Sequence, residues 1–132
     1  MQPAAVTQWI ERYERAWRSP GTHALVELFT LEATYRTAPF ERPHVGLAAI
    51  SELWEAERAG PDEAFAMTSE LLAASGLTAV VRVEVLYGAP ISRQYRDIWI
   101  MRFNDAGLCT SFEEWPFWPA DEDGGFAAGP PA

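Results

Sequence analysis

The apolar pattern of this chain changes its period at Gly60-Pro61, and this change limits the folds that the chain can adopt. Before this point apolar residues recur at helical spacing, beginning with Trp9, Ile10 and Tyr13. The pattern predicts three helices, over residues 7–18, 22–29 and 46–59, of which Thr7 caps the first. A strand is expected at residues 33–37 and a loop at residues 39–43.

Extended runs separated by short turns make up the chain after Gly60-Pro61. They cover about residues 64–74, 77–88, 91–104 and 107–118. Short turns such as Ser75-Gly76 favour antiparallel neighbours. Helices first and strands afterwards are typical of an α+β domain, here with three N-terminal helices packed on a curved antiparallel sheet. One domain is expected over residues 1–119, and the acidic segment 120–132, rich in Gly and Pro, is expected to be disordered.

The charge of the chain excludes several classes of function. Ten positive and nineteen negative residues give a net charge of −9, and no basic cluster is present to bind nucleic acid. All ten positive residues are Arg, so Schiff-base and P-loop lysine chemistry is impossible.

The histidines and the single cysteine point away from metals, cofactors and reactive thiols. His23 and His44 form no metal-binding motif, and Cys109 has no base near it in the sequence. We therefore expect no metal, no cofactor and an inert thiol. No apolar signal region or membrane-spanning run is apparent, which favours a cytoplasmic protein without a membrane partner.

The order of the expected elements is similar to that of a known superfamily. The stretch ATYRTAPFERPHVGLAAISELW follows an IERYERAW helix and precedes extended runs that end in RFNDAG and FEEWPFW. From residue 7 to residue 118 this pattern resembles the nuclear transport factor two-like superfamily, which includes SnoaL-like cyclases, ketosteroid isomerases and limonene epoxide hydrolases. The resemblance implies a cone-shaped, cystatin-like domain, commonly dimeric, with a hydrophobic pocket between sheet and helices. The function stays open, since this fold carries enzymes, ligand binders and transport adaptors.

One of three functional positions of the ketosteroid isomerases is retained. The tyrosine that donates to the oxyanion corresponds to Tyr13, whereas the base corresponds to Thr37 and the protonated acid to Trp99. Threonine has no accessible conjugate base near neutral pH, and tryptophan is a weak donor. The resemblance therefore disfavours the ketosteroid isomerase mechanism.

The pattern of the limonene epoxide hydrolases fits this sequence better. Its Arg-x-Asp pair corresponds to Arg82 and Glu84, its second Asp to Glu114, and its Tyr-x-Asn pair to Tyr35 and Thr37. Arg82 and Glu84 are two residues apart in a strand, so they point to the same face. Two interpretations stay open for this pair: the family register favours the pocket, whereas the valines between them favour a solvent-facing ion pair.

Asp97 is the most informative carboxylate, because it alternates with large apolar residues along one strand. A buried carboxylate must find a partner, here Arg36 or Arg93, or become protonated. The predicted catalytic residues are therefore Arg82, Glu84, Asp97 and Glu114. The predicted substrate-binding residues are mostly aromatic, although such residues also serve as plain core: Tyr13, Trp17, Tyr35, Thr37, His44, Trp54 and Trp99.

Two functions from different classes agree with these residues. The first is an enzyme that performs cofactor-free acid–base chemistry on a small apolar molecule, such as epoxide hydration, isomerisation or cyclisation. The alternative is a non-catalytic dimeric binding module for an apolar ligand, and a third hypothesis is an adaptor that uses the exposed sheet face. Apolar residues occur on both faces of the strands, for example Ile98 beside Trp99, which predicts a homodimer through the outer face.

Overall fold

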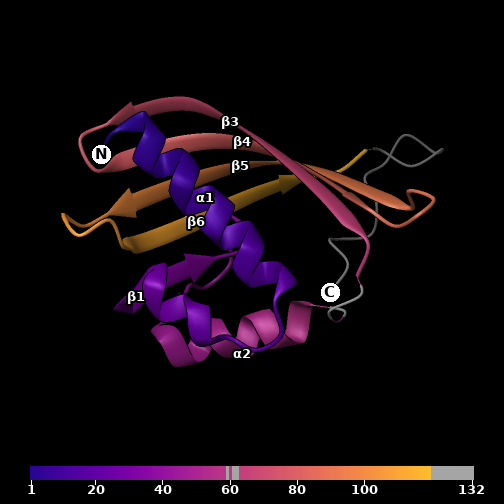
Figure 1. The fold of residues 1–132 in the computed structure, drawn as a ribbon, viewed down its shortest axis with the longest axis horizontal. Helices are drawn as coiled ribbons and strands as arrows, with labels where there is room; N and C mark the ends of the chain where they lie inside the picture. Colours follow the sequence, from indigo (N-terminus) through magenta and orange to yellow (C-terminus); the bar gives the residue numbers. More distant parts are fainter. Residues whose placement is uncertain (59, 61–62, 120–132) are drawn as a thin grey trace.

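Two helices and a six-stranded sheet form the computed structural model, which describes residues 1–58, 60 and 63–119 (Figure 1). The helical elements are α1 (Pro3–Arg18), the 3₁₀ helix η1 (His23–Glu27) and α2 (Leu47–Glu57). The strands are β1 (Phe29–Arg36), β2 (His44–Val45), β3 (Phe65–Ser75), β4 (Thr78–Tyr87), β5 (Arg93–Phe103) and β6 (Cys109–Phe117). The predicted α+β class is confirmed, and the predicted disorder of residues 120–132 lies outside the described residues.

The sheet is mixed, with strand order β2-β1-β6-β5-β4-β3. Neighbours from β3 to β6 pair antiparallel, as the short turns predicted. However, β1 pairs parallel to β6, so the prediction of an antiparallel sheet is wrong for this pair. The reason is the long connection from β1 to β6, which passes through α2 and four strands and places no short turn between the two strands.

The prediction of a second helix over residues 22–29 is wrong except for one short turn. Only the 3₁₀ helix η1 forms, and Phe29 begins β1 opposite Cys109. The carbonyl of Leu28 accepts hydrogen bonds from the indole of Trp9 at 2.9 Å and from the backbone N–H of Cys109 at 2.8 Å. These tertiary bonds hold Leu28 directly before the start of β1, and they outweigh the local helical pattern.

The predicted boundaries of the other elements need smaller corrections. The first helix begins at Pro3, and Thr7 lies inside it, where its hydroxyl donates to the Pro3 carbonyl at 3.2 Å. Proline suits a first turn because its missing N–H has no partner there in any helix. Within the segment predicted as a loop before the third helix, His44 and Val45 form the short strand β2 against β1.

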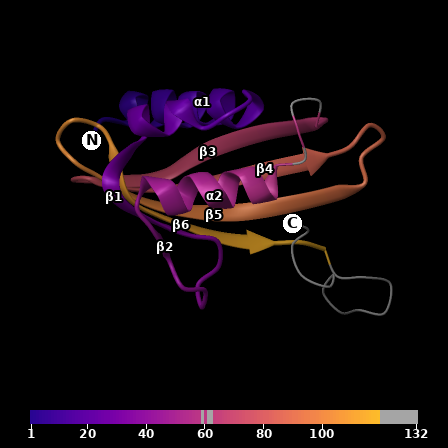
Figure 2. The ribbon, with the colours of Figure 1, turned by 90° about the horizontal axis from the view of Figure 1, so that it is seen from below.

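One face of the sheet is covered and the other is open. Helix α1 crosses the strands on the inner face, and α2 lies beside β1 and β2 (Figures 1 and 2). Along β4 the odd-numbered residues from Ala79 to Val85 are buried, whereas Arg82 between them is exposed. The core therefore lies between the inner face and the helices. None of the described helices is both long and apolar enough to cross a membrane.

Candidate active site

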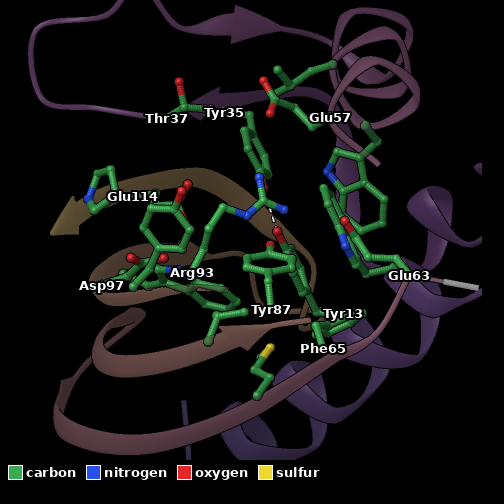
Figure 3. Close-up of a pocket in the computed structure, with 18 residues that line it drawn as sticks. Tyr13, Tyr35, Thr37, Glu57, Glu63, Phe65, Tyr87, Arg93, Asp97 and Glu114 are labelled. Carbon is green, nitrogen blue, oxygen red and sulfur yellow. Dashed lines mark hydrogen bonds between the residues drawn. The ribbon is translucent and has the colours of Figure 1, made fainter. Parts of the chain in front are cut away.

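A pocket of about 250 Å³ opens between the inner face of the sheet and the two helices (Figure 3). Its volume lies near the lower end of ligand pockets, which suits a molecule of one or two rings. Most of its wall is aromatic or aliphatic. The residues that line it are Tyr13, Trp17, Tyr35, Thr37, Leu53, Trp54, Glu57, Glu63, Phe65, Met67, Val85, Tyr87, Arg93, Tyr95, Asp97, Trp99, Glu114 and Pro116.

Asp97 and Glu114 form a carboxyl pair at the closed end of this pocket. They project from neighbouring strands, because Asp97 lies opposite Pro116 and Trp99 lies opposite Glu114. Residues 97 and 99 share one face of β5, as residues 114 and 116 share one face of β6. Asp97 is 3% exposed, and Glu114 is half-buried with its open side toward the pocket.

The two carboxyl groups have different tendencies to ionise. Burial raises the pKa of Glu114 well above its ordinary value, and the hydrogen bond and negative charge of Asp97 raise it further. Burial also raises the pKa of Asp97, but the hydrogen bond with Glu114 opposes this rise. Glu114 is therefore the group that retains a proton and donates it, and Asp97 is the group that ionises first.

Trp99 lies beside both members of this pair. Its indole N–H lowers the pKa of Asp97 and of Glu114, yet it makes no hydrogen bond of normal geometry to either carboxyl. The Oδ1 atom of Asp97 likewise has no hydrogen-bond partner in the described part of the chain. The donor Nε1 of Trp99 and the acceptor Oδ1 of Asp97 thus both lie below the pocket surface, where water does not reach them.

Tyr13 and Tyr35 supply hydroxyl groups close to the carboxyl pair. Their oxygens are 2.5 Å apart, and both side chains are buried. Burial raises the pKa of each phenol, and the charge of Glu114 raises both pKa values further. Both phenols therefore stay protonated at neutral pH. Two hydroxyls carry two hydrogens and their mutual bond uses one, so one O–H remains available to a ligand.

Arg58 holds the aromatic wall formed by Trp17 and Trp54. Its guanidinium donates to the carbonyls of Ser19 at 2.7 Å and Gly21 at 2.9 Å, which ties the end of α2 to the segment after α1. The same group lies 5.9 Å from the Trp17 ring and 5.8 Å from the Trp54 ring. The two indoles are therefore fixed by a cation on their outer side, as well as by their edge contact at 4.9 Å.

Three charged residues form the mouth of the pocket: Glu57, Glu63 and Arg93 (Figure 3). Arg93 is exposed and the two glutamates are half-buried. Sequence reasoning assigned none of them to the pocket and considered Arg93 only as a partner for Asp97. The alternation of β5 could have placed it, since residues 93, 95 and 97 share a face.

The structure brings most of the predicted site residues together. Of the predicted catalytic residues, Asp97 and Glu114 face the pocket. Six of the predicted substrate-binding residues line it, namely Tyr13, Trp17, Tyr35, Thr37, Trp54 and Trp99. Their catalytic and binding roles remain predictions.

Three predicted site residues lie outside the pocket. Arg82 and Glu84 are on the outer face of β4, where Arg82 pairs with Glu70, and Glu84 lies 3.7 Å from Arg96. The prediction that they face the pocket is wrong, because the valines between them occupy the inner face. His44 sits on β2 outside the lining, where its charge lowers the pKa of Glu57. Neither arginine considered for Asp97 forms an ion pair with it among the described residues, and Arg36 instead lies 3.5 Å from Glu113.

Glu114→Gln is expected to stabilise the protein at neutral pH. Because the pKa of Glu114 is raised in the folded state, its proton contributes stability that is complete below the unfolded pKa and is lost as pH rises through the folded pKa. Glutamine does not titrate, so the advantage of the variant should grow from pH 4 to pH 8. Thermal melts across this range measure it. A constant difference between the two proteins, or a variant that is less stable at pH 8, would contradict the raised pKa.

The fold and the pocket define a class of protein, the α+β cone with an internal pocket. Comparison with known families is more specific: the SnoaL-like domain matches residues 10–112, so the chain belongs to the SnoaL-like family, within the nuclear transport factor two-like superfamily. The predicted family is therefore confirmed. A search of curated proteins gave no match.

Solved structures share the fold at low sequence identity. A Sinorhizobium meliloti protein described as a candidate polyketide cyclase is 21% identical, with 86% of this chain and 99% of that chain covered and a TM-score of 0.62. A Δ5-3-ketosteroid isomerase from Mycobacterium sp. is 16% identical, with coverage of 84% and 92% and a TM-score of 0.66. An LEH-like epoxide hydrolase from M. tuberculosis is 11% identical, with coverage of 86% and 83% and a TM-score of 0.62.

Proposed function

We propose that this protein is a cofactor-free acid–base enzyme that isomerises or cyclises a small, largely apolar carbonyl compound through an enol. The observation that carries this proposal is the carboxyl pair of Asp97 and Glu114 at the closed end of an aromatic pocket. A pair in which one carboxyl holds its proton more strongly than the other supplies both an acid and a base.

The reaction uses only groups that the pocket contains. The ionised carboxylate of Asp97 removes a proton from the carbon next to the substrate carbonyl, so that the C–H bond breaks and its electron pair moves toward the carbonyl oxygen. Glu114 and the remaining O–H of the Tyr13–Tyr35 pair donate to this oxygen as its negative charge develops. Asp97 then returns the proton to another carbon, which completes an isomerisation. Alternatively, the enolate carbon attacks a second carbonyl of the substrate and closes a ring; the π bond of that carbonyl opens toward its oxygen, which takes the proton from Asp97. No oxidant, reductant or water is consumed.

Epoxide hydration is supported less well by the site. The corresponding pattern of the limonene epoxide hydrolases needs an arginine between two carboxylates, and Arg82 and Glu84 lie on the outer face. Isomerisation and cyclisation also agree with the descriptions of two structural neighbours as a ketosteroid isomerase and a candidate polyketide cyclase.

Exchange of carbon-bound hydrogen tests the proposal without knowledge of the natural substrate. 2-Tetralone, a bicyclic ketone with acidic C–H groups, is incubated with the protein in D₂O and followed by NMR. We expect deuterium to enter next to the carbonyl at a rate that rises in proportion to protein concentration. Binding of the ketone without such exchange would reject the enzyme and favour the non-catalytic binding module.

A homodimer through the outer sheet face remains part of this proposal. The outer face carries Ile98 and Ile100, and Trp115 on the neighbouring strand is 37% exposed. An apolar sheet face without a helix over it gains stability when a second copy covers it. Sedimentation velocity at micromolar concentration should give twice the mass of 14.7 kDa, and Ile100→Glu should give a folded monomer. A wild-type monomer would reject this interface.

A further inference from the structure

Among the residues that the structure describes, Arg93 is the only arginine that lines the pocket, and the sequence contains no lysine. Among the described residues it takes part in none of the ion pairs, although Glu57 and Glu63 also lie at the mouth. Elsewhere in the sheet, Arg82 pairs with Glu70 and Arg96 approaches Glu84. The guanidinium of Arg93 is thus a positive charge at a pocket mouth where none of the described carboxylates forms an ion pair with it.

The position of Arg93 is set by the sheet and by an aromatic ring. It lies directly opposite Tyr87 in the register of β4 and β5, and its guanidinium carbon is 5.0 Å from the centre of that ring. The stacking contact occupies the flat face of the guanidinium and leaves its N–H groups at the edge. A planar anion in the pocket mouth can accept two of these N–H groups in parallel.

The two ends of the pocket have opposite preferences for charge. Asp97 lies four residues from Arg93 on the same face of β5, which separates their Cα atoms by about 13 Å. An anionic group is repelled from the closed end by the ionised carboxylate of Asp97 and attracted at the mouth by Arg93. Burial raises the pKa of Glu57, which weakens the repulsion from this neighbour. The exposure of Arg93 also leaves a bound anion partly hydrated, which lowers the cost of removing it from water.

We propose that the substrate of this pocket is a monoanion, an apolar one- or two-ring compound whose carboxylate binds Arg93 at the mouth and whose carbonyl end reaches Asp97. This inference rests on the proposed function for the carbonyl end only. The carboxylate fixes the direction in which the molecule enters, so that the acidic carbon meets the base.

Binding of two matched probes tests the carboxylate site without any measure of activity. 2-Naphthoate and the neutral 2-naphthamide have the same ring system, and their binding quenches the fluorescence of the pocket tryptophans Trp17, Trp54 and Trp99. The wild type should bind naphthoate about tenfold more tightly than the amide, as expected for a charge-assisted hydrogen bond. Arg93→Gln should remove this preference and leave the affinity for the amide unchanged.

Arg96→Gln is the matched control, because it removes the same charge three residues away on the outer face. It should keep the preference for naphthoate. A preference that survives in Arg93→Gln, or an equal affinity of the wild type for both probes, would overturn the proposal. A naphthoate preference that depends on Arg93 in a protein without deuterium exchange would support the carboxylate site and reject the enzyme, so the two proposals fail separately.

Discussion

Asp97→Asn is expected to lower the rate of deuterium exchange into 2-tetralone roughly 10²–10⁴-fold, which is the usual contribution of a positioned acid or base. The substitution removes the base and keeps its shape. It also removes a carboxylate that is 3% exposed and whose Oδ1 has no hydrogen-bond partner, so the fold should tolerate the change. Affinity for the ketone should change little, because the aromatic wall is untouched.

A carboxylate on the opposite face of the sheet supplies the control for this experiment. Glu84→Gln removes a charge of the same type from the neighbouring strand β4, at a position outside the pocket. Exchange should remain at the wild-type rate in this variant. Equal losses in Glu84→Gln and Asp97→Asn, or full activity in Asp97→Asn, would show that Asp97 is not the base.

The pH profile of exchange adds an independent test of the same assignment. The active form has Asp97 ionised and Glu114 protonated, so the rate should rise with pH as the first group ionises and fall as the second loses its proton. The two apparent pKa values of this profile belong to the carboxyl pair as a unit. Both lie above the ordinary range of carboxyl groups, because burial raises the pKa of Asp97 and of Glu114. In Glu114→Gln the fall at high pH that is due to Glu114 should disappear.

The inward position of Asp97 was predictable because strand alternation needs only local sequence, whereas the position of Glu114 came from the resemblance to the limonene epoxide hydrolases. Asp97 shares its face with Tyr95, Trp99 and Met101, and burial of those side chains carries the carboxylate inward. The same rule, applied without the family register, also places Arg82 outward between buried valines. The error at Arg82 and Glu84 therefore came from carrying over a family pattern against the alternation of this chain.

Features that depend on distant partners were not predictable in this way. The helix expected over residues 22–29 gives way because Trp9 and Cys109 both bond to the Leu28 carbonyl, and neither partner is visible in the local pattern. The parallel pairing of β1 with β6 has the same origin, since it joins segments far apart in the chain. The mouth of the pocket combines Glu57 at the end of α2, Glu63 in a connection and Arg93 on a strand, a grouping that only the folded chain creates.

Trp99→Ala is expected to reduce the free energy of unfolding by about 3–5 kcal/mol, the usual cost of removing a large aromatic side chain from a core. Trp99 is 3% exposed, and its ring lies 4.8 Å from that of Tyr13 and 4.9 Å from that of Phe112. Its removal takes one ring contact from each of these two residues and widens the pocket. Since single domains are stable by about 5–15 kcal/mol, the loss is a large share of the total.

Denaturant melts of Trp99→Ala and Trp99→Phe separate the two roles of this side chain. Phenylalanine keeps a ring against Tyr13 and Phe112 but lacks the N–H beside the carboxyl pair, so its loss of stability should be clearly smaller than that of alanine. Without the N–H, which lowers the pKa of both carboxyls, the rising limb of the exchange profile in Trp99→Phe should move to higher pH. A cost below about 1 kcal/mol for alanine would show that Trp99 does not pack in the core. An unmoved pH profile in the phenylalanine variant would show that the indole N–H of Trp99 does not contribute to the titration of Asp97.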